Sequence, residues 1–387
     1  MRDKQENLTR PVVLVADNSV AVTGALVAIR NATDQLKAQY EFVYVLPTGS
    51  LGKSVLEQAG YQVRELPFVE ISRRKTALLR YVPMLLLNGW RLRKLARVHK
   101  ARIVHLNDFY NLTGYVAKLL SLGTLRVVTH VRFLPQSLPQ PLARTWRWLA
   151  ERFADRVLCV SAAVRRYFGA SGKVRVVFDP VPAVEKHAVP VLPAYRSDST
   201  VQLLYLSNYI QGKGQNFALQ AFRQAYAQNN QLRLAFVGGD MGLEKNRQFR
   251  QQLEADVQQY NLAAVVTFEG FVTDVEKRIK AADILLNFSE SESFSLTCLD
   301  ALYYGTPLIA TDCGGPAELF ENGKSGLLVP NRDVEAMAAA IARLAANPAE
   351  RAQFSAAGRA YVRHKFQQAA TYEQLGRIYQ ELLAAEA

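Results

Sequence analysis

The sequence predicts an α/β protein in which two Rossmann-like domains face a central cleft. With 387 residues, the chain is too long for one ordinary core. Short apolar runs of strand length alternate along it with segments of helical periodicity. This alternation stops once, in a segment that contains Pro180, Pro182, Pro190 and Pro193, and it restarts at residue 201.

The first domain is expected over residues 1–182 and begins with a strand, a loop and a helix. Residues 11–16 (PVVLVA) are the strand, and a loop over residues 17–23 leads through Gly24 into a helix at residues 25–36. Ligands of open α/β sheets bind at such loops, where strands reach their carboxyl ends. Further strands are expected at residues 41–46, 103–106, 126–130, 156–160 and 173–178.

A linker over residues 183–200 is expected to lead into the second domain, residues 201–366. This domain repeats the alternation of strands and helices. Its strands are expected at residues 203–206, 233–238, 264–268, 283–288 and 308–310. The last segment, residues 367–387, contains a helix expected at residues 371–384.

The composition limits the setting in which the protein works. The N-terminal residues are polar, and no apolar run approaches the roughly 20 residues that a membrane span needs, so we expect a cytoplasmic protein. The three cysteines show no C-x-x-C spacing, which argues against a disulfide framework and against a structural zinc site. Cys159 and Cys298 lie in apolar runs and are expected to be buried thiols.

Positive charge gathers in the first half of the chain. Residues 1–190 hold 29 Lys and Arg against 13 Asp and Glu, and the rest holds 18 against 21. The densest basic stretch, residues 71–102, surrounds an apolar block that includes Trp90. This pattern predicts peripheral attachment to an anionic surface, the inner face of a membrane. A core helix with a solvated basic face is the alternative, and Pro83 is expected to interrupt the segment. No nucleic-acid-binding motif is present, so nucleic acid is not expected as a partner.

Residues 289–315 contain the most informative motif of the chain. Glu292 and Asp300 are separated by eight positions around a predicted strand-to-helix turn, and Gly314 and Gly315 follow the next predicted strand. A helix that starts near Phe294 or Ser295 offers backbone N–H groups and a positive dipole end, which suit a diphosphate. Taken alone, the two carboxylates are also compatible with helix caps.

This motif, Glu292-Ser-Phe-Ser-Leu-Thr-Cys-Leu-Asp300 followed by Gly305-Thr-Pro307 and Gly314-Gly315, resembles the E-x7-E signature of retaining glycosyltransferases of family four, which have the GT-B fold. Asp300 stands where the family has Glu. Other blocks agree in order, among them Lys213-Gly214 and Gly238-Gly239. The resemblance covers most of the chain and implies a C-terminal helix that crosses back to the first domain.

The resemblance implies transfer of a sugar from a nucleotide-diphosphate donor to a glycan or lipid-linked acceptor. Lys213 would act as a point charge on the diphosphate, Glu292 would lie near the donor sugar, and Asp300 would accept hydrogen bonds from the ribose. Asn208 replaces an arginine that usually precedes the lysine. The remaining donor-binding residues that the resemblance implies are Gly24, Phe271, Val272, Ser293, Phe294, Ser295 and Leu296.

On the acceptor side, the family commonly has a histidine near the donor sugar. His130 fills that place in one alignment and Arg132 in another, and His130 is the preferred catalytic candidate. Asn107 and Asp108 end the strand before it and are candidates for binding acceptor hydroxyls, although a helix cap would also explain them.

No metal and no cofactor beyond the co-substrate is expected, because the sequence lacks an Asp-x-Asp motif and Lys213 offers a fixed cation instead. Two other functions stay open. One is a sugar-nucleotide epimerase on the same fold. The other is a catalytically degenerate, transferase-like binding module, which the replacements at Asn208 and Asp300 favour.

Overall fold

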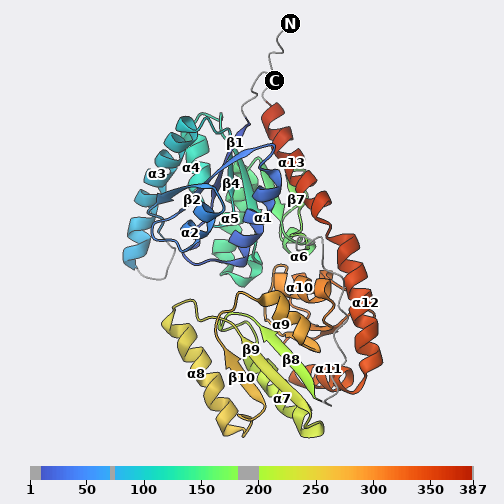
Figure 1. The fold of residues 1–387 in the computed structure, drawn as a ribbon. Helices are drawn as coiled ribbons and strands as arrows, with labels where there is room; N and C mark the ends of the chain where they lie inside the picture. The colour runs from blue at the N-terminus through green and yellow to red at the C-terminus, as the bar shows by residue number, and fades with distance from the viewer. Residues whose placement is uncertain (1–9, 70–74, 182–199, 386–387) are drawn as a thin grey trace. The chain divides into compact units, whose positions relative to one another are not determined.

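The computed structural model describes residues 10–69, 75–181 and 200–385 of the chain, which folds into two compact units (Figure 1). The first unit comprises Met1–Val160, Val164–Phe178 and the C-terminal Ala369–Ala387. The second comprises Ser161–Ala163 and Asp179–Gln368. All of the expected linker except residue 200 lies outside the described residues.

The first unit is built on a parallel sheet of seven strands in the order β3-β2-β1-β4-β5-β6-β7. Its strands are β1 (Val12–Ala16), β2 (Glu41–Pro47), β3 (Gln62–Leu66), β4 (Ile103–Leu106), β5 (Arg126–Val131), β6 (Arg156–Cys159) and β7 (Val174–Val176). Its helices are α1 (Gly24–Leu36), α2 (Gly52–Gln58), α3 (Lys75–Val98), α4 (Thr113–Leu120), η1 (Pro135–Ser137) and α5 (Gln140–Phe153). The short α6 (Ala162–Arg165) contains residues of both units.

The last helix, α13 (Gln368–Ala384), completes the core of the first unit. Its buried face packs against side chains of α1, β1 and β2. Tyr379 is fully buried, and its ring meets Tyr40 edge-on at a centroid distance of 5.3 Å. The helix therefore belongs to the first unit although it follows the whole second unit in the sequence.

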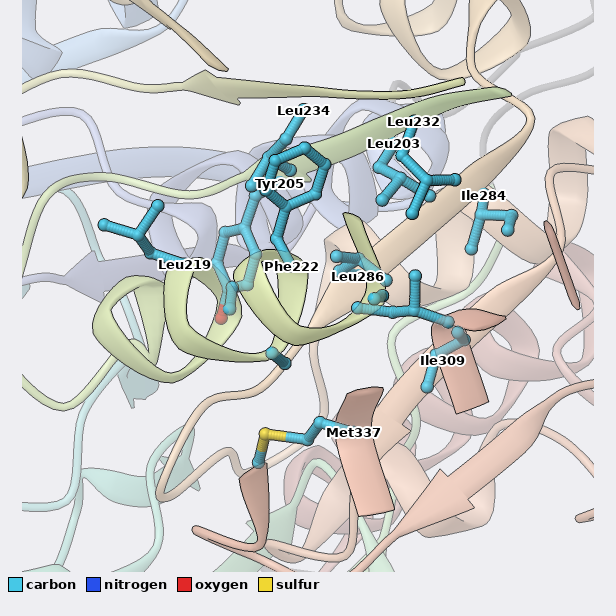
Figure 2. Packing of buried hydrophobic residues seen from close by; sticks show 14 of the residues in the cluster. Leu203, Tyr205, Leu219, Phe222, Leu232, Leu234, Ile284, Leu286, Ile309 and Met337 are labelled. Atoms are coloured by element: carbon cyan, nitrogen blue, oxygen red, sulfur yellow. The ribbon is translucent and has the colours of Figure 1, made fainter. Parts of the chain in front are cut away.

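The second unit has a parallel sheet of six strands in the order β10-β9-β8-β11-β12-β13. These are β8 (Val201–Leu206), β9 (Leu232–Val237), β10 (Val266–Glu269), β11 (Ile284–Asn287), β12 (Leu308–Thr311) and β13 (Leu327–Val329). The helices are α7 (Gln215–Gln228), α8 (Glu244–Gln259), α9 (Val275–Ala281), α10 (Leu296–Tyr304), η2 (Gly315–Glu318), α11 (Val334–Ala346) and α12 (Pro348–Lys365). Figure 2 shows Leu219 and Phe222 of α7 in one cluster with the strand residues Leu203, Tyr205 and Leu234.

Two parallel sheets covered by helices confirm the predicted fold class. Strands β3 and β13 were not among the predicted strands. β3 (QVREL) is an edge strand of the sheet with two buried residues, so its sequence lacks a continuous apolar run. β13 is a three-residue strand at the edge of the second sheet.

The prediction that Pro83 interrupts the basic segment is wrong, because α3 is one helix of 24 residues that contains it. Pro83 and Leu79, one turn earlier, are both exposed, so water can bind the carbonyl group that loses its partner at the proline. Arg73 and Arg74 of the basic stretch lie outside the described residues. In the described part of the chain, every helix is too short or too polar to span a membrane.

Candidate active site

The acidic motif lies at the carboxyl end of the second sheet, where β11 ends and the loop to α10 begins. There the ammonium group of Lys213 lies 2.6 Å from Glu292 Oε1. Ser289 donates to the same carboxylate oxygen at 3.1 Å. Two residues that are 79 positions apart in the chain thus form one charged pair, with Lys213 31% exposed and Glu292 15% exposed.

The pair lies in a partly buried place, and this affects the lysine. Burial alone would lower the pKa of Lys213, but the adjacent Glu292 carboxylate outweighs it and raises the pKa. Lys213 is therefore a cation at all physiological pH values. Its charge is available to a diphosphate that displaces Glu292 or binds beside it.

Backbone contacts hold the two loops of this pair in place. The hydroxyl group of Tyr205 donates to the carbonyl oxygen of Lys213 and accepts from the backbone N–H of Phe288 at 2.9 Å. Gly214 follows the lysine with φ +80°, and a Cβ added there would lie 1.9 Å from the Phe288 carbonyl oxygen. Only glycine lets the Lys213 loop approach the end of β11 this closely.

The Glu292 loop is also joined to the loop that follows β12. The backbone N–H of Gly315 donates to the Glu292 carbonyl at 2.8 Å, and the Glu292 N–H donates to Cys313 at 3.4 Å. A Cβ on Gly315 would lie 2.3 Å from the Ser293 carbonyl oxygen. The Gly-Gly loop therefore fixes the acidic loop from one side, as the Lys213 loop does from the other.

Helix α10 begins one residue later than the latest predicted start. Ser295 is its N-cap at φ +78°, and its hydroxyl accepts from the Cys298 N–H at 3.4 Å and from the Asn287 amide at 3.1 Å. Phe294, which was predicted to contribute to the diphosphate cradle, is 2% exposed. Asp300 lies on the second turn, and burial raises the pKa of its carboxyl group to about 7.

The other predicted donor residues are divided between the two units. Asn208 Oδ1 accepts from the Gly239 N–H at 3.1 Å, so this residue anchors a neighbouring loop where the family has a cation. Phe271 is 73% exposed and its Cβ lies beside Gly239. Gly24, by contrast, is the first residue of α1 and belongs to the first unit.

The acceptor-side candidates form a polar cluster at the carboxyl edge of the first sheet. Arg132 donates from Nε to Asn107 Oδ1 at 2.7 Å, and its Nη2 lies 3.2 Å from Nδ1 of His130. Asn107 in turn donates to Asp17 Oδ2 at 2.6 Å. The chain of contacts Asp17, Asn107, Arg132, His130 thus links the ends of three adjacent strands.

Burial sets the charge states in this cluster. Burial, then the charge of Arg132, holds the pKa of His130 well below its usual value, and burial lowers that of His105 to about 3. Both rings are neutral, so Nδ1 of His130 accepts from Arg132. Burial, with a contribution from Asp17, raises the pKa of Asp108 to about 7. His130 is 2% exposed, whereas Arg132 is half-buried, so Arg132 presents more surface to a ligand.

Sequence reasoning missed three residues of these sites. Tyr205 and Ser289 hold Lys213 and Glu292, and Asp17 orients Asn107. Asp17 directly follows β1, so its place at a carboxyl strand end was a usable signal. Tyr205 lies within an apolar run, and nothing in the local sequence distinguishes its hydroxyl from that of any core tyrosine.

Two Rossmann-like units, each a parallel sheet covered by helices, are the fold of GT-B type proteins. Residues 22–183 match the family described as Glycosyltransferase Family 4, and residues 196–361 match Glycosyl transferases group 1. The chain belongs to the glycosyltransferases of family-four type.

Curated relatives agree with this assignment. Human alpha-1,3/1,6-mannosyltransferase ALG2 is 31% identical over 189 residues, which are 47% of this chain and 45% of the human protein. D-inositol 3-phosphate glycosyltransferase of Thermobispora bispora is 30% identical over 289 residues, 68% of this chain and 64% of that protein. The matches thus span about half to two thirds of the length of these relatives.

Solved structures show the same fold. Anabaena HepE in complex with UDP-glucose has a TM-score of 0.79 at 19% identity, covering 96% of this chain and 99% of that one. Sucrose-phosphate synthase of Thermosynechococcus elongatus has a TM-score of 0.74 at 22% identity, with coverage of 97% and 100%.

Proposed function

We propose that the protein is a retaining, metal-independent glycosyltransferase of the hexosyltransferase type. It moves a sugar from a nucleotide-diphosphate donor to a glycan or lipid-linked acceptor, in the cytoplasm and at the inner face of a membrane. The observation that carries the proposal is the Lys213–Glu292 pair beside the N-terminus of α10.

Lys213 and α10 together meet the main chemical demand of the reaction. When the sugar leaves its nucleotide, negative charge develops on the diphosphate and must be stabilised. The ammonium group of Lys213 and the positive end of α10 supply fixed charge for this purpose, so that no divalent ion is needed. When the diphosphate pairs with Lys213, the Glu292 carboxylate loses its ion pair with the lysine and accepts hydrogen bonds from the sugar.

The rest of the donor has natural partners in the second unit. No residue in the described ranges forms a hydrogen bond with the Asp300 carboxyl group, which leaves it open to the two ribose hydroxyls. The exposed ring of Phe271 offers a flat surface for the base next to Gly239. Ser293 lies two residues before the N-cap of α10, and Leu296 is the first residue of that helix. Val272 follows Phe271 in the sequence.

On the acceptor side, we assign hydroxyl binding to Asp108 and Arg132, with Asn107 and His130 holding Arg132 in place. Retention of configuration would follow from attack on the same face of the sugar from which the diphosphate departs. The departing phosphate oxygen then takes the proton of the acceptor hydroxyl. This step rests on the family resemblance.

The similar proteins support a nucleotide-sugar donor. One relative is named a mannosyltransferase, another a D-inositol 3-phosphate glycosyltransferase, and the HepE structure contains UDP-glucose. UDP-glucose is therefore the first probe, within a panel of UDP-, GDP-, ADP- and dTDP-sugars.

The test measures donor binding by calorimetry and thermal shift for the wild type and for Lys213→Ala. We expect one donor class to bind, and Lys213→Ala to weaken it about 10- to 100-fold, because a charge-assisted contact of roughly 1.5–3 kcal/mol is lost. Lys324→Ala is the matched control, since Lys324 forms a surface ion pair with Glu321 in the same unit. This control should bind as the wild type does.

Other outcomes identify other functions. Turnover of the nucleotide sugar to an isomer with no acceptor present indicates the epimerase. Binding that survives without turnover across a broad acceptor panel indicates the binding module. If no nucleotide or nucleotide sugar binds, the transferase proposal is wrong. Added EDTA should leave the rate unchanged, and a loss of activity that Mg²⁺ restores would contradict metal independence.

A further inference from the structure

Helix α3 exposes a row of large apolar side chains to solvent. Leu79 is 77% exposed, Leu86 55% and Trp90 49%. Val82 and Leu87 are exposed between them. Since each of these positions lies three or four residues from another of them, all five lie on one side of the helix. We refer to Leu79, Val82, Leu86, Leu87 and Trp90 as the α3 stripe.

The α3 stripe is not part of the core, because the helix has a second apolar side. Leu92 and Ala96 are buried, and Gly89 lies so close to Val116 of α4 that an added Cβ would be 2.3 Å from it. This side fixes α3 to the rest of the first unit. A helix that is apolar on two opposite sides needs a second apolar environment for the side that faces outward.

Positive charge surrounds the α3 stripe. Residues 71–150 contain 15 Lys and Arg and a single acid, Asp108, so the net charge of this segment, +14, exceeds the +13 of the whole chain. Arg80, Lys94 and Arg97 of α3 are exposed. Among the residues that the structure describes, no carboxylate pairs with them, and Lys94 lies 5.7 Å from the ring centre of Trp90.

A second exposed tryptophan lies in the same layer of helices. Helix α4 packs against α3, and its Lys118 donates to the Phe153 carbonyl at the end of α5 at 3.0 Å. Figure 1 shows α3 and α4 side by side. On α5, Trp148 is 59% exposed between Arg144 and Arg152, which are each one turn away and exposed. Both tryptophans thus have cations on their own helix as neighbours.

We propose that α3, with the Trp148 side of α5, is the surface by which the protein lies on an anionic lipid bilayer. The α3 stripe enters the level of the headgroups while the surrounding Lys and Arg contact lipid phosphates. The inference rests on the proposed function, since it names the surface that brings the enzyme to a lipid-linked acceptor.

A second copy of this chain fits the surface less well than a bilayer does. In a two-fold dimer this surface would meet itself and bring two strongly basic faces together, with no carboxylate on α3 of either copy to oppose the cations. An anionic bilayer fits both the apolar stripe and the surrounding charge. It offers hydrocarbon for the α3 stripe and negative charge for the Lys and Arg side chains around it.

Co-sedimentation with vesicles tests the proposal. We expect the protein to bind vesicles of phosphatidylcholine and phosphatidylglycerol, and to bind phosphatidylcholine alone much more weakly. Leu79→Ser with Leu86→Ser should weaken binding at least tenfold, since two partly inserted apolar side chains are lost. Leu51→Ser is the control, because Leu51 is 66% exposed at the start of α2.

Charge is tested separately from the apolar contact. Lys94→Gln with Arg97→Gln should weaken binding by roughly fivefold for each charge removed, and raised salt should reduce it further. Lys245→Gln with Arg247→Gln removes two exposed cations from α8 and should have no effect. In a Trp148→Phe protein, brominated lipids should quench Trp90, while the buried Trp146 stays unquenched.

Each adverse result has a definite meaning. The proposal is overturned if anionic vesicles do not bind the wild type, or if the α3 variants bind them as tightly as the controls do. It is also overturned if the wild type is a dimer that Leu79→Ser with Leu86→Ser converts to a monomer. Calorimetry of the same variants with a nucleotide sugar, without lipid, shows whether the donor site is intact, so failure of the surface and failure of the proposed function are seen separately.

Discussion

Asp300 is a half-buried carboxyl group on α10 that forms no ion pair within the described residues, and its protonation therefore depends on pH near neutrality. Burial disfavours the ionised form and raises its pKa to about 7. Hydroxyl groups of a ribose donate more strongly to a carboxylate than to a neutral carboxyl group. Ligand binding and loss of the proton should therefore be coupled.

We expect donor affinity to increase about tenfold between about pH 6 and pH 8, because the ionised fraction of Asp300 rises over this window. Calorimetry with an intact nucleotide sugar measures it, since such a donor has no phosphate group that titrates near pH 6. Asp300→Asn should bind more weakly at pH 8 and without this pH dependence. A pH profile that is the same in Asp300→Asn and in the wild type would refute the coupling.

At the scale of residues, the sequence identified candidate site residues but not the residues that they contact. Lys213 and Glu292 were both chosen as candidates, and the structure joins them in one ion pair. Lys213 and Glu292 meet because the loop after β8 lies close to the loop after β11. No local sequence pattern predicts that two loops so far apart in the chain come together. The burial of His130 was equally beyond the sequence, because it results from packing at the end of the first sheet.

At the scale of elements, the Lys213 loop depends on the close packing of Gly214 against the end of β11. Gly214→Ala places a Cβ where the Phe288 carbonyl oxygen lies and also strains φ at +80°. We expect it to destabilise the second unit by about 3 kcal/mol or more and to abolish donor binding, because Lys213 is displaced.

Gly323→Ala separates the two effects of Gly214→Ala, which are the strain at positive φ and the clash of the added Cβ with β11. Gly323 has φ +75° in the same unit, but a Cβ there would meet nothing within 4 Å. Gly323→Ala should lower the free energy of unfolding by only about 1 kcal/mol and leave donor binding unchanged. Urea denaturation and calorimetry measure both quantities. Equal losses in the two variants would show that backbone strain, and not the approach to β11, controls the site.

Element prediction succeeded where the apolar pattern was continuous and failed where burial was partial. Strands β1, β2, β8 and β11 are buried along most of their length, and their positions agree with the predicted runs to within about two residues. The edge strand β3 has only two apolar residues, Val63 and Leu66, separated by two charged ones, and it is not among the predicted strands. Helix α3 continues through Pro83 because the carbonyl group that loses its partner there, that of Leu79, lies on an exposed turn where water can bind it.

For the whole molecule, α13 is the element on which the first unit depends most. Ile378 is fully buried among side chains of the first sheet and α1. Ile378→Ala should destabilise the first unit by about 2–5 kcal/mol, since it leaves a cavity in that core. Hydrogen exchange should report faster opening of β1 and β2, while β8 and β9 keep their protection.

The exposed Gln380 of α13 provides the control, and Gln380→Ala should leave both units unchanged. If Ile378→Ala speeds exchange equally in both sheets, the two units unfold as one cooperative block. The contribution of α13 to the first unit would then have to be measured in another way.

The position of α13 has a consequence for how the chain folds on the ribosome. Every residue of β8 to β13 is made before Tyr372, Leu375 and Ile378, so the second unit can close its core while the first still lacks part of its own. The unit that begins synthesis first is therefore the last to be completed. In the interval, the apolar groove that awaits α13 on α1 and the first sheet is open, which makes it the surface of the nascent protein most in need of a chaperone.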